Sequence, residues 1–220
     1  MMQQRVTTGR GRCVRAMVMA AGLLPATTGG AAADQPSGTL SGKIVYVHAG
    51  HGATSNNLGD GSWGYQRPEL FEMIEDLGNQ DAMTLLVEEL WKAGATVVPL
   101  RPVGDQPREV VLDNDDPGVE FIGTWFDSVS PVYFGGVNDV PYRFAGTSPV
   151  ETAVARFRPD LPVGDWYPVY AWTRPGLDRV EQVYRVVHAG GAAEVVVDHR
   201  RVGNGLVYLG TWWFEAGTSG

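Results

Sequence analysis

The stretch that decides the fold of the first half of the chain begins KIVYVHAGHG at residues 43–52. Its apolar run at 44–47 predicts a β-strand, which ends in a loop where glycines flank His51. A helical pattern then continues to Gly94, and the sequence TVVPLR at 96–101 predicts a second strand. This order predicts an α/β unit whose ligands would bind beyond the carboxyl end of its first strand.

The predicted helix covers one face of this unit. Its apolar residues at helical spacing, which are expected to pack on the sheet, are Ala82, Leu85, Leu86, Leu90 and Ala93. Asn79 is the predicted N-cap, since an asparagine side chain can accept a hydrogen bond from the free backbone N–H groups of the first turn.

His51 and Glu75 are the candidate metal ligands of this unit. The glycines beside His51 allow a sharp turn and leave room next to the imidazole. Glu75 stands just before the helix, where a carboxylate suits the positive end of the helix dipole. Histidine and glutamate are residue types that bind zinc. The alternative interpretation is a polar turn with a solvated glutamate.

Four motifs follow one another in this region, namely VHAGHG at 47–52, WGYQR at 63–67, EDLGN at 75–79 and GATVVPLR at 94–101. Together they resemble the zinc-dependent N-acetylmuramoyl-L-alanine amidases of the amidase-3 type, in their xanthan-lyase-like variety. The resemblance implies a partial amidase fold at 43–103, zinc held by His51 and Glu75, and peptidoglycan as the substrate. The second histidine ligand and the proton-shuttling glutamate of that family have no counterpart in this sequence. His48 is a further residue that could assist the metal.

Beyond a short linker at 104–108, residues 109–220 have a different pattern. Short apolar runs alternate with turn residues, without a helical period of useful length. The sequence HAGG at 188–191 predicts a hairpin turn, and His199 is expected at an exposed strand end. The pattern predicts an antiparallel β-sandwich with a core of its own.

Several motifs of this second region stand in order, namely DNDDPG at 113–118, GTW at 123–125, YRF at 142–144, YPVYAW at 167–172, VHAGG at 187–191 and LGTW at 209–212. They resemble the golvesin C-terminal-like domain, also called the xanthan-lyase carbohydrate-binding-like domain. The resemblance implies a β-sandwich of secreted bacterial proteins with a carbohydrate-binding role. That family pattern continues for one or two strands beyond the position of Gly220, so the resemblance predicts a fragment, truncated at its C-terminus.

Trp212 and Trp213 are the candidate carbohydrate-binding residues. Neighbouring residues of a strand point to opposite faces of a sheet, so one of the two is expected to be exposed for stacking on a sugar ring. Trp125, Trp166 and Trp172 are either core residues or parts of a sugar-stacking platform.

Residues 1–33 have the organisation of a signal peptide. Arginines precede an apolar run at 16–24 that is too short to span a bilayer, and AAA at 31–33 is a small-residue cleavage site. The mature chain would begin with a linker at 34–42 and would be secreted or periplasmic, without a membrane span. Cys13 is the only cysteine, so the mature chain would have neither a disulfide nor a cysteine ligand. The alternative is a disordered basic tail.

Net charge and motifs together leave two candidate functions. The net charge of -8 argues against nucleic acid as a partner, because phosphate binding needs a basic face. The first function is a secreted cell-wall hydrolase, a zinc amidase of peptidoglycan with an inserted β-sandwich, inactive in this chain. The second is a non-catalytic secreted protein that binds the cell wall or another polysaccharide.

Overall fold

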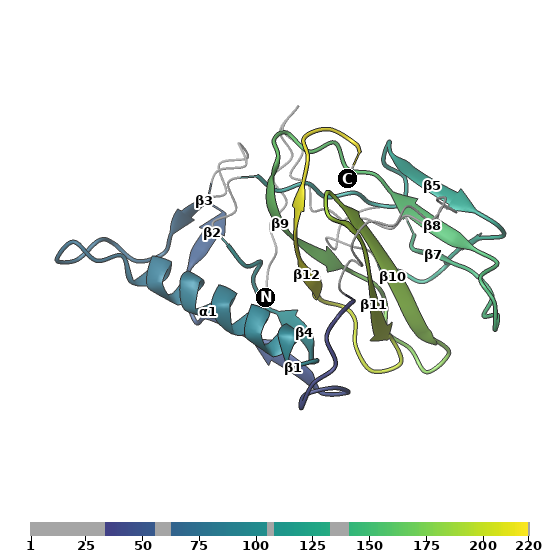
Figure 1. The fold of residues 1–220 in the computed structure, drawn as a ribbon, viewed down its shortest axis with the longest axis horizontal. Helices are drawn as coiled ribbons and strands as arrows, with labels where there is room; N and C mark the ends of the chain where they lie inside the picture. The colour runs from purple at the N-terminus through teal and green to yellow at the C-terminus, as the bar shows by residue number, and fades with distance from the viewer. Residues whose placement is uncertain (1–33, 56–62, 105–107, 133–140, 220) are drawn as a thin grey trace.

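The computed structural model describes residues 34–55, 63–104, 108–132 and 141–219 (Figure 1). The predicted signal peptide lies outside these residues. Their helix and strands, in chain order, are β1 (Ile44–Val47), β2 (Ala53–Ser55), β3 (Trp63–Tyr65), α1 (Glu75–Lys92), β4 (Thr96–Pro99), β5 (Val119–Ile122), β6 (Phe126–Asp127), β7 (Arg143–Phe144), β8 (Val154–Phe157), β9 (Asp165–Ala171), β10 (Glu181–His188), β11 (Gly191–Asp198) and β12 (Val207–Phe214). Over this part of the chain, no helix combines the length and the apolar character that crossing a membrane requires.

A four-stranded sheet in the order β1-β4-β12-β9 lies at the centre of the molecule (Figure 1). β1 and β4 are parallel, with Tyr46 opposite Val98, and α1 connects them as the sequence pattern predicts. β12 lies antiparallel to β4, with Tyr208 opposite Val97, and pairs with β9 on its other side. One sheet therefore contains strands from both halves of the chain.

The hydrophobic core is also common to both halves. The larger cluster contains Val98 of β4 together with side chains of β9 to β12, and Trp91 of α1 packs against it. The smaller cluster, between α1 and the sheet, includes Tyr170 and Tyr208 from the β-rich half. Apart from Val98, the buried residues of the larger cluster all lie between Ala155 and Phe214, as predicted for a core of residues 109–220, while β12 also joins the sheet of the α/β unit.

Helix α1 begins earlier than the sequence pattern predicts. It starts at Glu75 after Ile74, whose side chain makes no capping hydrogen bond. Asn79 consequently lies inside the helix, and its prediction as the N-cap is wrong. Glu75 and Asp76 are in the first turn, where their negative charges suit the helix dipole.

The face of α1 that packs on the sheet is only in part the predicted one, since Leu90 packs against the smaller cluster as predicted. Its buried residues are Asp76, Gln80, Met83 and Val87. Leu85 and Leu86, which the apolar pattern assigns to the sheet side, are exposed. The pattern misleads because two of the buried positions are polar and have partners of their own. Gln80, for example, donates from Nε2 to the carbonyl oxygens of Pro102 and Gly104, at 2.7 and 2.9 Å.

The hairpin of β10 and β11 packs against the central sheet (Figure 1). The two strands pair along their full length and leave Ala189 and Gly190 as a two-residue turn, as predicted. Val186 of the hairpin is in the same buried cluster as Val169 and Leu209 of the sheet. Two further antiparallel pairs, β5–β8 and β6–β7, complete this half. Antiparallel layers around one core are consistent with a β-sandwich domain.

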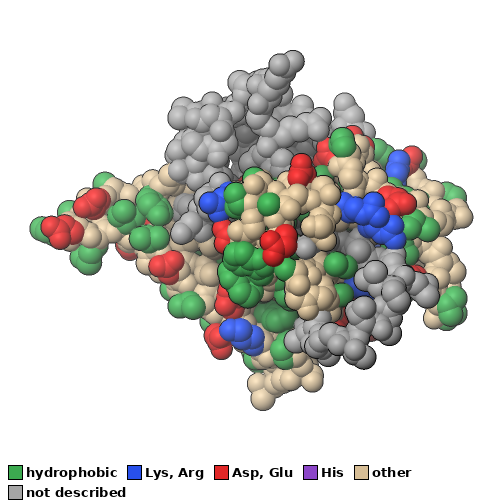
Figure 2. Space-filling view, turned by 45° about the horizontal axis from the view of Figure 1, so that its top comes forward, with side chains coloured by type: hydrophobic (Ala, Val, Ile, Leu, Met, Phe, Trp, Pro, Cys, Tyr) green, Lys and Arg blue, Asp and Glu red, His purple; other side chains and the backbone are tan. Residues whose placement is uncertain are grey.

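An arm at 66–74 projects from the molecule between β3 and α1, at the left of Figure 1. Leu70 and Met73 form an isolated β-bridge, and Phe71 and Glu72 between them adopt left-handed backbone conformations with φ of 51° and 61°. Figure 2 shows hydrophobic and acidic side chains side by side on this arm. The turn therefore holds Phe71 in solvent, away from both hydrophobic clusters.

Candidate functional site

The loop after β1 and the start of α1 bring His51 and Glu75 together. His51 Nε2 lies 3.2 Å from Glu75 Oε1, and His51 Nδ1 is hydrogen-bonded to Asp76. The amide nitrogen of Asn79 lies against the same imidazole, 3.1 Å from Nδ1 and 3.2 Å from Nε2. The convergence of His51 and Glu75 at the carboxyl end of β1 agrees with the sequence prediction, and their role as metal ligands stays a prediction.

Asp76 orients the imidazole from its buried side. Its carboxylate accepts a hydrogen bond of 2.7 Å from the backbone N–H of Arg67. Burial acts to raise the pKa of Asp76, but the hydrogen bonds from Arg67 and His51 outweigh burial and lower the pKa below its ordinary value. An ionised Asp76 accepts from Nδ1 and leaves Nε2 directed at Glu75, which is how a carboxylate orients a metal-binding histidine.

This cluster does not complete a catalytic zinc site within the described residues. Nε2 of His51 and the carboxylate of Glu75 are two donors, whereas catalytic zinc has three protein ligands and a water molecule. Across the described ranges, no group of three or more His, Cys, Asp and Glu residues is arranged to hold a metal ion. His48 accepts a hydrogen bond of 2.8 Å from the backbone N–H of Gly50 in its own loop.

The remaining two histidines lie far from this cluster in the β-rich half. His188 stacks on Trp212, with ring centroids 5.7 Å apart. His199 is buried, where Nε2 contacts the hydroxyl of Tyr184 at 2.7 Å and Nδ1 contacts the carbonyl oxygen of Val202 at 2.9 Å. The prediction of an exposed His199 is therefore wrong, because the chain folds back at Val202 and covers the ring.

Trp212 and Trp213 face opposite sides of β12, as the alternation of a strand requires. Trp212 is only 9% exposed and packs edge-on against Trp91 at 5.9 Å. The prediction of Trp212 as a sugar-stacking residue is therefore wrong, because its ring is part of the core. Its ring also lies over Gly210, where a Cβ atom would come within 2.4 Å of it. Trp213 is 38% exposed and is the member of the pair that faces solvent.

Trp166 of β9 extends the exposed aromatic surface of Trp213. The two residues are register partners, and their ring centroids are 6.0 Å apart at an interplanar angle of 77°. Trp166 is 63% exposed. Polar groups lie beside the two rings. Asp165, next to Trp166 in the chain, forms an ion pair of 2.6 Å with Arg108, and Trp213 Nε1 donates a hydrogen bond to Glu215 at 3.4 Å. We call Trp166 and Trp213 the tryptophan pair.

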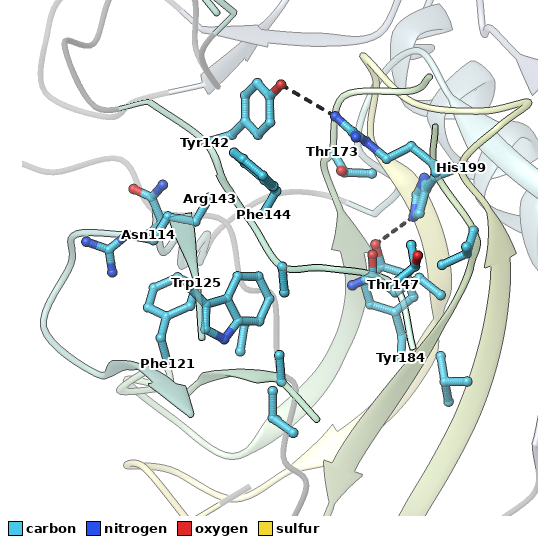
Figure 3. A pocket seen from close by; sticks show the side chains of 18 of the residues that line it. Asn114, Phe121, Trp125, Tyr142, Arg143, Phe144, Thr147, Thr173, Tyr184 and His199 are labelled. Carbon is cyan, nitrogen blue, oxygen red and sulfur yellow. Dashed lines mark hydrogen bonds between the residues drawn. The ribbon is translucent and has the colours of Figure 1, made fainter. Parts of the chain in front are cut away.

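A cavity of about 510 Å³ lies elsewhere in the β-rich half (Figure 3). Phe121, Trp125, Tyr142 and Phe144 supply aromatic rings to its wall, and those of Phe121 and Trp125 are in edge contact at 5.0 Å. Asn114, Arg143 and Arg179 are among its polar lining residues. Trp125 and Trp172, which the sequence predicts as core residues or parts of a sugar-stacking platform, both line this cavity. The sequence does not predict the cavity itself, because its lining comes from β5, β7, β10 and several loops that are far apart along the chain.

Comparison with known proteins identifies the class of this chain. The pattern of the Golvesin C-terminal domain matches residues 110–220, half of the chain. The chain therefore belongs to the Golvesin C-terminal domain family.

Two relatives are xanthan lyases. The chain is 32% identical to the xanthan lyase of Bacillus sp. (strain GL1) over 124 residues, which are 56% of this chain and 13% of that enzyme. Among solved structures it is similar to Paenibacillus xanthan lyase at 29% identity and a TM-score of 0.44, covering 49% of this chain and 10% of that one. The chain thus spans a small part of the length of these relatives.

Proposed function

We propose that this protein is a secreted polysaccharide-binding protein and that the tryptophan pair is its sugar-binding surface. Membership of the Golvesin C-terminal domain family and similarity to an enzyme named for xanthan, a polysaccharide, support this proposal. The observation that carries it is the exposure of Trp166 and Trp213 in register on neighbouring strands.

The tryptophan pair has the physical properties of a sugar platform. An indole ring offers a large rigid apolar face on which the C–H groups of a pyranose ring can pack, at little cost in conformational entropy. The charged groups of Asp165, Arg108 and Glu215 at the edge can accept or donate hydrogen bonds to sugar hydroxyls. Both tryptophans stand on a hydrogen-bonded strand pair, which holds their rings in place.

The proposal is tested by retention on polysaccharides. Native gels containing xanthan, and sedimentation with insoluble peptidoglycan and cellulose, would measure binding by the wild-type protein and by Trp213→Ala. Leu177→Ala, which removes an exposed apolar side chain elsewhere, is the matched control. We expect the wild type and Leu177→Ala to be retained on at least one polysaccharide and Trp213→Ala to be retained less. Equal retention of Trp213→Ala and wild type would contradict the proposed surface.

A second candidate function is a zinc amidase of peptidoglycan. The contact between His51 and Glu75, with Asp76 behind the imidazole, is the observation in its favour. The described residues supply two of the three ligands, so a third donor and the proton-transferring carboxylate would have to come from residues outside them. Peptide release from peptidoglycan by the longest natural form, compared with His51→Ala and Glu75→Ala, tests this function.

We also propose that the protein is exported. Export predicts a mature N-terminus at or near Asp34.

A further inference from the structure

One end of the cavity is rich in guanidinium groups around Tyr142. The Tyr142 hydroxyl accepts hydrogen bonds from Arg174 Nη1 at 2.9 Å and from Arg179 Nη2 at 3.4 Å. The same two guanidinium groups lie 5.9 and 5.7 Å from the centroid of the Tyr142 ring. Arg143 follows Tyr142 in the chain, and its guanidinium lies 4.6 Å from the centroid of Phe121. Arg143, Arg179 and Tyr142 line the cavity, and Arg174 stands next to Tyr142.

The carboxylates near these groups neutralise them only in part. Asp178 pairs with Arg179 at 3.0 Å, and Asp127 pairs with Arg143 at 2.9 Å. Both carboxylates are largely exposed, at 77% and 64%, and exposed ion pairs contribute little because water screens them. In the part of the chain that the structure describes, no carboxylate lies within 4.0 Å of the Arg174 guanidinium. Immediately around the Tyr142 hydroxyl, where Arg174 and Arg179 meet and, of the described carboxylates, only Asp178 pairs with them, positive charge is therefore in local excess.

The state of Tyr142 agrees with that excess. Burial raises the pKa of Tyr142, but its hydrogen bonds with Ser128 and Arg174 and the charges of Arg174 and Arg179 outweigh burial, so the pKa lies below its ordinary value.

Besides Asp178, three carboxylates line the cavity, those of Asp113, Glu151 and Glu181. Glu181 pairs with Arg200 at 3.1 Å.

The wall beside the arginines is aromatic. Figure 3 shows Phe121, Trp125 and Phe144 on the side of the cavity next to Tyr142 and Arg143. Trp125 Nε1 donates to the carbonyl oxygen of Ile122 at 2.9 Å, which fixes the indole ring. The volume of about 510 Å³ is in the range of small-ligand sites. A ligand that matches both the aromatic wall and the arginines has an apolar ring face and an anionic group.

We propose that this cavity binds a sugar unit that carries a carboxylate, as a uronic acid does. The carboxylate accepts hydrogen bonds from Arg179, which lines the cavity, and Arg174 adds its positive charge from behind Tyr142. The sugar ring packs against the aromatic wall at Trp125. Guanidinium groups suit this task because their N–H donors match the two oxygens of a carboxylate. The inference rests on the proposed function in taking the ligand to be a carbohydrate, and it adds a site separate from the tryptophan pair.

Calorimetric titration of the full chain with the trimer of galacturonic acid tests the inference. The carboxyl-reduced trimer, which is neutral and otherwise the same, is the comparison ligand. We expect the acidic trimer to bind about tenfold or more tightly than the neutral one, since hydrogen bonds to charged groups are the stronger ones. Higher salt should narrow this difference. Equal affinity for the two trimers would overturn the inference, as would equally tight binding of inorganic sulfate.

Arginine variants test which side chains bind the carboxylate of the sugar. Arg179→Gln should weaken binding of the acidic trimer by about tenfold, and Arg174→Gln, which removes a charge beside the cavity, should weaken it by less. Both variants should leave binding of the neutral trimer unaffected. Arg179→Lys should restore part of the loss because it keeps the charge. Arg158→Gln is the matched control, since Arg158 pairs with Glu120 outside the cavity. Unchanged affinity of both glutamine variants for the acidic trimer would overturn the assignment.

The two proposals fail in different ways. If Trp213→Ala loses retention on polysaccharide while the wild type does not bind the acidic trimer, the cavity inference is wrong and the proposed function stands. If the acidic trimer binds and depends on Arg179 while Trp213→Ala retains polysaccharide normally, the cavity inference stands and the tryptophan surface is wrong.

Discussion

The α/β region at 43–103 and the β-rich region at 110–219 bury different kinds of side chain. In the first, the sheet-facing side of α1 includes Asp76, which is hydrogen-bonded to His51, and Gln80, which donates to the carbonyl oxygens of Pro102 and Gly104 after β4. In the second, valines and aromatic rings fill the larger cluster, and tryptophans remain on the surface. The first region thus uses part of its buried helix face to hold polar groups, and β12 and β9 of the second region complete its sheet. We therefore expect the stability of the first region to depend on the second.

The largest expected effect tests that dependence at Trp91. Its indole packs against both regions, with edge contacts to Tyr208 at 6.2 Å and Trp212 at 5.9 Å. Trp91→Ala should lower the free energy of unfolding by roughly 3 kcal/mol or more, because a large ring between two clusters leaves a cavity. Leu86→Ala, on the exposed side of the same helix, should change it by less than about 0.5 kcal/mol.

Urea denaturation measures this difference. A single transition that shifts as a whole in Trp91→Ala is expected, because the two regions share one sheet. Two separate transitions, with only the first affected, would show that the regions fold independently.

The next effect concerns the buried carboxylate of Asp76. Asp76→Asn should cost about 1–3 kcal/mol at neutral pH, because hydrogen bonds to a charged, buried group are lost. Since folding lowers the pKa of Asp76, its contribution is fully present above the ordinary pKa of about 4 and is lost as pH falls through the folded-state value. The urea midpoint of the wild type should therefore fall more steeply below about pH 4 than that of Asp76→Asn. Asp81→Asn, at an exposed position of α1, should follow the wild type.

A smaller effect is expected at the tryptophan pair, on binding and not on stability. Trp166→Ala should weaken polysaccharide binding by about 1 kcal/mol, or roughly fivefold, because one stacking face is removed. Its urea midpoint should stay close to that of the wild type, because the ring is largely exposed. A large loss of stability would indicate that Trp166 is a structural residue.

The smallest effect is expected for zinc. Two donors hold a metal weakly, so zinc should raise the free energy of unfolding by less than about 0.5 kcal/mol. His51→Ala should remove even that. Tight one-to-one zinc binding that disappears in His51→Ala would show that a third ligand is present. That result would support the amidase as the function of the α/β region.

The sequence predicts the order of the helix and strands better than it predicts which of their faces are buried. The motif around His51 and the stop at Gly94 fixed the strand–helix–strand order, since both signals are local. Of the predicted packing face of α1, Leu90 packs against the core, whereas the burial of Asp76 and Gln80 is not predictable because they are polar and their partners lie in distant loops.

The two candidate sugar sites also depend on tertiary contacts that the sequence does not reveal. Alternation predicted that Trp212 and Trp213 diverge, but which one is buried depends on the irregular register near Gly210 and on packing against α1. The sequence offered Trp125, Trp172 and the YRF motif, which line the cavity, but it did not show that they meet, because the arginines and aromatic rings come together only through the tertiary fold.

The most direct test of the proposed sugar-binding surface is the binding isotherm of Trp166→Ala/Trp213→Ala on the polysaccharide that retains the wild type. We expect the double variant to lose affinity by more than about tenfold, with an unchanged urea midpoint. An isotherm that superimposes on that of the wild type would contradict the claim that this surface binds the polysaccharide.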